Sequence, residues 1–466
     1  MNSIIKNIFL YVAKKLGLEL ADKTYQPNDF FDVNHISVTA TLAERLANIT
    51  LTGSKLNVEG TNKRAELIEE VANQIYQDHL KNACTFALGT GSALIKPNTD
   101  GERFGFDIVQ ENDYAITGNI GNYIYAVLIK SSEYEAMYSK YTLIESQEIK
   151  ESNGTKYVEI KYSAFKDDKE CPIAETRWKD YKTQIIPNVD RLLFGRIKCP
   201  TTNRKDINSP NGVPITFGLG EVVNNSKDSY RQYNQERKDK ESYIFANKSI
   251  FKKDRQGKPV LPTGKERLFM STPSRGVDDS NMINIYSPEI RDTSLDNAIE
   301  RNFRVLELMA GLGEGLLSKS TLTYTNMDEV RAMKQATYSF MDTFRESIDA
   351  CIEDVLYAVD VIANYNNMTP QGEYKAYIDW SDEYMSSVSE RFNQYMQAEN
   401  AGWIEAAEGR AMLMNEDIDE AREAIEKIKG EEDKTMDESF DNMNPEQKED
   451  DNSPEEDKEE EENAVS

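Results

Sequence analysis

The most suggestive chemical motif in this 466-residue sequence is a short run that comes close to a phosphate-binding loop. Residues 313–320 read GEGLLSKS, whereas a phosphate-binding loop reads GxxxxGK[ST]. Gly313, Lys319 and Ser320 match the pattern, but Ser318 occupies the place of the second glycine. Such a loop holds phosphates with backbone N–H groups and the start of a helix, so it must follow a buried strand and open a helix.

The surroundings of this run predict something other than a nucleotide site. Apolar residues at helical spacing over 295–309 place a helix, not a strand, before the glycines. The residues after the run, TLTYTN, have no helical pattern, and no apolar strand ending in a magnesium-binding acidic residue follows. We therefore expect Gly311, Gly313 and Gly315 to act as a loop hinge where the chain leaves one helix.

The sequence offers no set of residues that would form a zinc site or a Cys/His catalytic site. The chain has two histidines and four cysteines, and the cysteines show no CxxC spacing. We expect a reduced intracellular protein with no catalytic residue, no metal and no cofactor. The turn Gly89-Thr90-Gly91 lies between a helix and a strand, the reverse of the dinucleotide-binding order, so we expect positive φ there rather than a nucleotide.

The charge of the chain is concentrated at its C-terminal end. The net charge is −27, and residues 431–466 contribute 17 acidic and 3 basic side chains to it. This segment has almost no apolar residue, so burial cannot offset the entropy of ordering it, and we expect a disordered acidic tail. A role in binding a partner or mimicking DNA stays open for it.

The N-terminal half predicts an α+β fold. Residues 1–16 form an amphipathic pattern that favours a packing helix, with an interfacial anchor as the alternative, and Lys14 and Lys15 make the apolar run too short to be a signal or a membrane span. Helical periodicity follows over 39–49 and 65–88. Short runs rich in Val, Ile and Tyr over 89–187 then predict a mostly antiparallel sheet.

The C-terminal half predicts mainly helices. A polar helix is expected over 220–246, exposed or packed against copies of itself because its apolar residues are scattered. A helix capped by Thr293 and Asp296 follows, then a helix of roughly 40 residues starting near 327. The remaining expected elements are a strand over 374–380 and helices over 383–398, 403–413 and 416–429.

A basic segment lies between the two central helices. Residues 248–275 read as a hairpin formed by SIFKK and RLFMS, and they carry eight basic and two acidic side chains. The pattern fits either a solubilised hairpin or a docking surface for an acidic partner or a DNA backbone. The candidate docking residues are Lys248, Lys252, Lys253, Arg255, Lys258, Lys265 and Arg267.

This order of parts resembles the portal proteins of tailed phages, in particular the family common in phages and prophages of Gram-positive bacteria. The resemblance covers about residues 1–430 and rests on their order together with diffuse patterns. Among these patterns are FALGTGSALIKP, ANKSIFKKDRQGKPV, LMAGLGEGLLSKSTLTYTNMDEVRAMKQATYSFMDTF and the segment that begins IDWSDEYMSSVSERFNQYMQAEN.

The resemblance implies a division of the chain into the parts of a portal subunit. The implied parts are a wing (1–216), a first stem helix (217–246), a clip (247–287), a second stem helix (288–312), a tunnel loop (313–326), a long wing and crown helix with a C-terminal helical region (327–430), and the acidic tail (431–466). The side chains implied to face DNA in the tunnel loop are Ser318, Lys319, Ser320, Thr321, Thr323 and Tyr324.

The resemblance also implies a function and partners. Portal proteins form rings of 12 subunits at one capsid vertex, where they are virion components assembled in the host cytoplasm. Double-stranded DNA passes through the channel without sequence-specific contacts, and the implied partners are terminase, head–tail connector proteins, and capsid and scaffold proteins, with no membrane. A different virion structural or adaptor protein is the main alternative, and an NTP-driven packaging motor is a further one.

Overall fold

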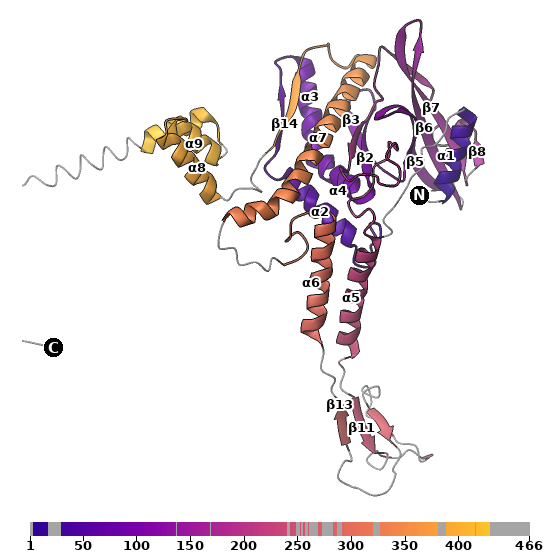
Figure 1. Cartoon of the computed structure of the whole chain (residues 1–466). Helices are drawn as coiled ribbons and strands as arrows, with labels where there is room; N and C mark the ends of the chain where they lie inside the picture. The colour runs from indigo at the N-terminus through magenta and orange to yellow at the C-terminus, as the bar shows by residue number, and fades with distance from the viewer. Residues whose placement is uncertain are drawn as a thin grey trace, which may run out of the picture. The chain divides into compact units, whose positions relative to one another are not determined.

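The computed structural model describes residues 3–16, 29–136, 138–167, 169–239, 243–247, 252, 255–256, 260, 269–272, 283–286, 291–319, 327–380, 388–414 and 416–428 (Figure 1). The chain divides into two compact units, Met1–Met385 and Ser386–Ser466, which we describe separately. Helices make up 45% and strands 25% of the structure, which confirms the predicted α+β class.

The helical side of the first unit consists of α2 (Val38–Leu51), α3 (Lys63–Gln74), a π-helical segment (Ile75–His79) and α4 (Leu80–Thr90). Ser37 caps α2 by accepting a hydrogen bond from the N–H of Ala40, and Asn62 caps α3 in the same way. The predicted helix over 65–88 is therefore present, but its hydrogen-bond pattern changes to the π form at its centre.

Helix α7 (Met327–Tyr365) has 39 residues and matches the long helix predicted from the sequence. Its side chains Phe344, Ile348 and Val355 are fully buried in the largest core cluster, together with residues of α2, α3 and α4. Burying an apolar side chain of this size contributes about 1.5–3 kcal/mol. The stripe of apolar residues thus fixes α7 against the helical side of the unit.

A three-stranded antiparallel sheet packs against α4 and α7, in the order β10 (Gly195–Lys198), β2 (Ser92–Thr99), β3 (Phe104–Gln110). Gly91, before β2, has φ of +114°, which confirms the positive φ predicted there. A Cβ at Gly91 would lie 2.6 Å from the carbonyl carbon of Gly212. Gly195 also allows a close approach of two backbone segments, because a Cβ there would lie 2.2 Å from the carbonyl oxygen of Cys351 on α7.

A second antiparallel sheet confirms the sheet predicted over 89–187. Its strands are β4 (Tyr114–Ile120), β5 (Tyr123–Ala136), β6 (Ser139–Ser152), β7 (Thr155–Lys166) and β8 (Lys169–Cys171), with β9 (Gln184–Pro187) paired to β7. A 3-10 turn, η2 (Ile173–Glu175), follows β8. Helix α1 (Ser3–Leu16) packs on this sheet through Ile8 and Phe9, which confirms the packing helix.

The end of α7 is tied back to α3. Strand β14 (Lys375–Asp379), close to the strand predicted over 374–380, pairs antiparallel with β1 (Lys55–Glu59). Arg64, which is fully buried, donates hydrogen bonds to the Asn364 side chain at 2.5 Å and to the carbonyl of Thr369 at 2.7 Å. A buried guanidinium satisfied by these acceptors holds the turn after α7 in place.

The segment between the two central helices is described only in part. Helix α5 (Gly220–Asp239) ends before the predicted 246, and β11 (Tyr243–Asn247) follows it. β11 pairs in parallel with β12 (Phe269–Thr272) and antiparallel with β13 (Ile283–Tyr286). Apart from Lys252, the SIFKK run lies outside the described residues, so its pairing with RLFMS as a hairpin stays a prediction.

The start of the next helix also differs from the prediction. Helix α6 (Asp292–Met309) begins one residue before Thr293, and its N-cap residue, Arg291, makes no side-chain capping hydrogen bond. The predicted capping box of Thr293 and Asp296 is therefore wrong, because Thr293 already lies inside the helix.

In the second unit, α8 (Val388–Asn400), α9 (Ala406–Met414) and a helix over 418–428 agree with the three helices predicted there. The predicted disordered tail over 431–466 lies outside the described residues. Within the described helices, none combines the length and the apolar composition that a bilayer-spanning segment requires.

Candidate functional site: the loop after helix α6

Helix α6 ends in a Schellman motif. Gly311 has φ of +75°, and its N–H donates to the carbonyl of Leu308 at 3.1 Å. The N–H of Leu312 donates to the carbonyl of Glu307 at 2.9 Å, which is the second bond of the motif. The side chain of Leu312 is buried and joins the main core cluster. The first glycine of the run therefore reverses the chain in a defined conformation.

The carboxylate of Glu307, in the last turns of α6, organises the rest of the loop. Its Oε1 accepts hydrogen bonds from the N–H of Leu317 and, at 3.1 Å, from the N–H of Ser318. Its Oε2 accepts the hydroxyl of Ser318 at 2.6 Å and the N–H of Gly315 at 3.4 Å. Glu307 is fully buried, so these donors replace the water that the carboxylate loses.

The loop is also attached to α7 and α2. The N–H of Gly313 donates to the hydroxyl of Thr337, a fully buried residue of α7, at 2.8 Å. Arg45 of α2 donates a hydrogen bond to the carbonyl of Leu316, whose side chain is buried. Residues 311–318 are therefore held by three helices, whereas the sequence predicted a flexible hinge.

The predicted DNA-facing residues fall into three groups. Ser318 is only 6% exposed and its hydroxyl is bonded to Glu307, so the prediction that it faces DNA does not fit its burial. The side chain of Lys319 is 76% exposed, and its Nζ lies 3.7 Å from the carboxylate of Asp296 on α6. The predictions for Ser320, Thr321, Thr323 and Tyr324 lie outside the described residues.

Helices α5 and α6 lie side by side and present the loop at one end of the pair (Figure 1). The side chain of Asn302 donates to the Ser229 hydroxyl at 3.0 Å, and Arg291 forms an ion pair with Glu236. Near the loop, a small apolar cluster is shared by both helices and the start of α2. Its fully or nearly fully buried members are Val38, Leu219, Val223 and Leu306.

The last turns of α6 expose a group of apolar side chains. Leu308 is 75% exposed and Met309 59% exposed, and Val305 lies beside them on the same helix. Large apolar side chains grouped on one helix mark a surface that is covered by another molecule in many proteins. Helix α5 carries four acidic and four basic residues and α6 four acidic and two basic ones, so the pair has a net charge of −2.

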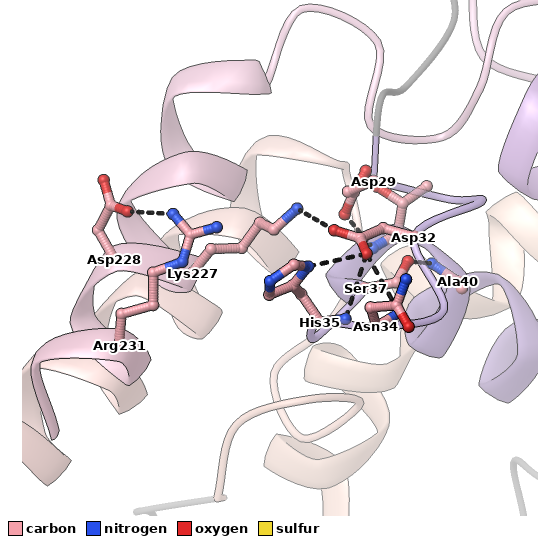
Figure 2. Close-up of polar contacts among 10 residues, drawn as sticks. Asp29, Asp32, Asn34, His35, Ser37, Ala40, Lys227, Asp228 and Arg231 are labelled. Carbon is pink, nitrogen blue, oxygen red and sulfur yellow. Dashed lines mark hydrogen bonds and ion pairs between the residues drawn. The ribbon is translucent and has the colours of Figure 1, made fainter. Parts of the chain in front are cut away.

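Figure 2 shows how the start of the helix pair is joined to the body of the first unit. Asp32 lies between Lys227 of α5, at 3.6 Å, and the ring of His35, at 3.0 Å. The hydrogen bond from His35, more than the attraction of Lys227, lowers the pKa of Asp32. Asp29 nearby accepts the hydroxyl of Thr39 at 2.8 Å and also its N–H. These contacts fix α5 to the start of α2.

Only two residues of the predicted docking surface can be placed. Lys252 and Arg255 are exposed. The remaining predicted docking residues, Lys248, Lys253, Lys258, Lys265 and Arg267, lie outside the described residues.

Sequence reasoning did not single out Glu307 or Thr337. The available signal was position: Glu307 follows Phe303 by four residues and precedes Ala310 by three, so it shares the inward stripe of α6 with them. An acidic residue on an apolar stripe at a helix C-terminus is unfavourable for the helix dipole and therefore calls for a partner. Here the partner is the loop backbone.

The described part of the loop, residues 311–319, is not placed as a phosphate-binding loop would be. Helix α6, not a strand, precedes its glycines, as the sequence predicted. Within the part of the chain that is described, no group of three or more His, Cys, Asp or Glu side chains is arranged to hold a metal ion. In comparisons with known proteins, no family model matches this chain, and no curated protein matches it either.

Proposed function

We propose that this chain is a portal-type subunit that assembles into a ring of about a dozen copies. The ring would form the channel at one capsid vertex through which double-stranded DNA is packaged and ejected. It would also dock terminase and head–tail connector proteins. The proposal takes its family from the sequence patterns and its physical support from the α5–α6 pair.

The observation that carries the proposal is the exposed apolar surface of this pair. Leu308 and Met309 are each more than half exposed in the isolated chain, although they lie one turn from a buried apolar cluster. Full burial of an apolar side chain of this size would stabilise the protein by about 1.5–3 kcal/mol, and the exposed parts of Leu308 and Met309 do not contribute to this. Contact with a neighbouring copy in a ring would recover that energy.

The charges of the pair suit a channel for a polyanion. Proteins that grip DNA neutralise its phosphates with an excess of Lys and Arg. Helix α5 has balanced charge, and the exposed Lys319 lies close to Asp296. A lining of this kind would let DNA slide, with Lys319 as a single phosphate contact at the loop.

A matched pair of variants tests the proposal. Leu308→Asp places a charge on the proposed contact, and Ile120→Asp places the same charge on a strand-end residue that is also 75% exposed. Light scattering after gel filtration should give a ring for the parent chain and for Ile120→Asp, and smaller species for Leu308→Asp. A ring that tolerates Leu308→Asp would contradict the proposed contact, and a chain that is monomeric throughout would contradict the function.

A further inference from the structure

A cavity of about 580 Å³ opens between β10, α7 and the turn that joins β4 to β5. Arg196 and Lys198 of β10 line it together with Ser347 and Asp354 of α7, and the Ser347 hydroxyl accepts a hydrogen bond from the backbone N–H of Lys198 at 2.8 Å. Tyr123, the first residue of β5, also lines the cavity. The volume falls within the range of about 300–1,000 Å³ that is typical of small-molecule sites.

The lining of this cavity is basic, although the chain as a whole carries a net charge of −27. Arg191 is already engaged, because its guanidinium binds Glu353 at 2.9 Å and Asp354 at 3.0 Å. The other basic lining residues are Lys156, Arg196 and Lys198, and the second acidic one is Asp190. Asp190 is held by the hydroxyl of Tyr357 at 3.0 Å.

The geometry of β10 places two cations side by side. Arg196 and Lys198 are two residues apart on a strand, so their side chains leave the same face, while Gly195 and Ile197 are buried on the other. One guanidinium nitrogen of Arg196 donates to the carbonyl of Pro210 at 2.9 Å. Both side chains still line the cavity.

Lys198 has no counter-charge among the described residues. No carboxylate of the described chain lies within ion-pair distance of its Nζ, and the side chain is about half-buried. Burial, followed by the nearby charge of Arg196, lowers the pKa of Lys198. A partly desolvated ammonium beside a guanidinium is unfavourable unless an anion offsets it.

The buried carboxylate of Glu111 does not act as the counter-charge of Lys198. Glu111 attracts Lys198 from a distance, but it accepts hydrogen bonds from the hydroxyls of Ser92 and Tyr114, the latter at 2.7 Å. Glu111 is buried, so it belongs to the interior of the unit rather than to the cavity wall. The cavity therefore keeps an excess of positive charge.

We propose that this cavity is a binding site for a small, multiply charged phosphate compound, with Arg196 and Lys198 as its main contacts. Arg supplies a fork of N–H donors for phosphate oxygens and Lys supplies a mobile point charge. Leu192 and Phe194 line the same cavity, so there is also an apolar wall for an organic group. The site is independent of the proposed ring.

The test is calorimetric titration of the full chain with pyrophosphate at low salt. We expect binding to the parent chain and a loss of about tenfold or more in affinity for Lys198→Met and for Arg196→Met. Lys205→Met is the matched control, since this exposed lysine lies outside the cavity and its loss should leave affinity unchanged. Thermal unfolding checks folding: Lys198→Met should be at least as stable as the parent because it removes like-charge repulsion.

Two results would overturn the proposal. One is pyrophosphate affinity that is absent, or that falls equally in Lys198→Met and Lys205→Met. The other comes from a second arm with a duplex oligonucleotide that lacks terminal phosphates. If this duplex displaces pyrophosphate and loses affinity in Lys198→Met, the ligand is a nucleic-acid backbone and not a small phosphate compound.

Discussion

Replacing Glu307 by Gln should release the loop after α6 while keeping the size of the side chain. The substitution exchanges one carboxylate oxygen for an NH₂ group. The Ser318 hydroxyl can rotate to accept from that NH₂, so the remaining oxygen would still face the N–H groups of Leu317 and Ser318. The variant side chain therefore keeps three of its four hydrogen bonds, all of them now neutral, and loses only the longest, the 3.4 Å bond from the N–H of Gly315.

The size of the effect follows from these three bonds. A hydrogen bond to a charged group contributes about 1.5–3 kcal/mol and a neutral one about 0.5–1.5 kcal/mol, so each bond loses roughly 1 kcal/mol. The loop should lose about 3 kcal/mol of local stability, which corresponds to about a 100-fold change in its opening equilibrium.

Hydrogen exchange of the backbone N–H groups of Leu317 and Ser318, followed by mass spectrometry, measures this opening directly. We expect exchange in Glu307→Gln to be faster by up to about 100-fold. Glu314→Gln is the control, because Glu314 is an exposed residue of the same loop. Unchanged exchange in Glu307→Gln, or equal acceleration in Glu314→Gln, would refute the role assigned to the buried carboxylate.

Three further predictions concern other parts of the first unit. In urea titrations, Gly91→Ala should lower the free energy of unfolding by about 3 kcal/mol or more, and Gly101→Ala by only about 1–2 kcal/mol. Both glycines have positive φ, but of the two only Gly91 has a backbone neighbour, Gly212, where the new methyl group would lie. Asp32 has a lowered pKa when folded, so its stabilising effect is present above 3.8 and is lost as the pH falls through the folded value. The melting temperatures of the parent and Asp32→Asn should therefore differ at pH 6, and the difference should shrink as the pH falls below 3.8; a constant difference would contradict this. Lys319→Ala should leave the oligomer intact and change DNA packaging or retention, measured as DNA per particle, and unaltered packaging would remove Lys319 from the site.

The helices were predictable because their apolar residues repeat with the helical period. The 39-residue α7 is the clearest example: residues such as Phe344, Ile348 and Val355 keep one face apolar, and the helix bounds match the prediction. The positive φ of Gly91 was predictable for a local reason too, since a helix and a strand meet there. Local sequence is sufficient where the cause of the structure is local.

The features that the sequence did not predict lie where distant residues decide the structure. The parallel pairing of β11 with β12 joins partners more than 20 residues apart, and no local pattern indicated it. The burial of Ser318 depends on Glu307, which lies eleven residues earlier on α6. The cavity beside Arg196 and Lys198 is likewise formed by strands, a turn and a helix that are remote in sequence.

Electron microscopy of the purified full-length chain tests the central proposal most directly. We expect closed rings with a central channel and twelve-fold symmetry, in which the exposed face of α6 near Leu308 contacts a neighbouring copy. Particles that are monomeric, or closed assemblies without a central channel, would contradict the proposal that this chain conducts DNA.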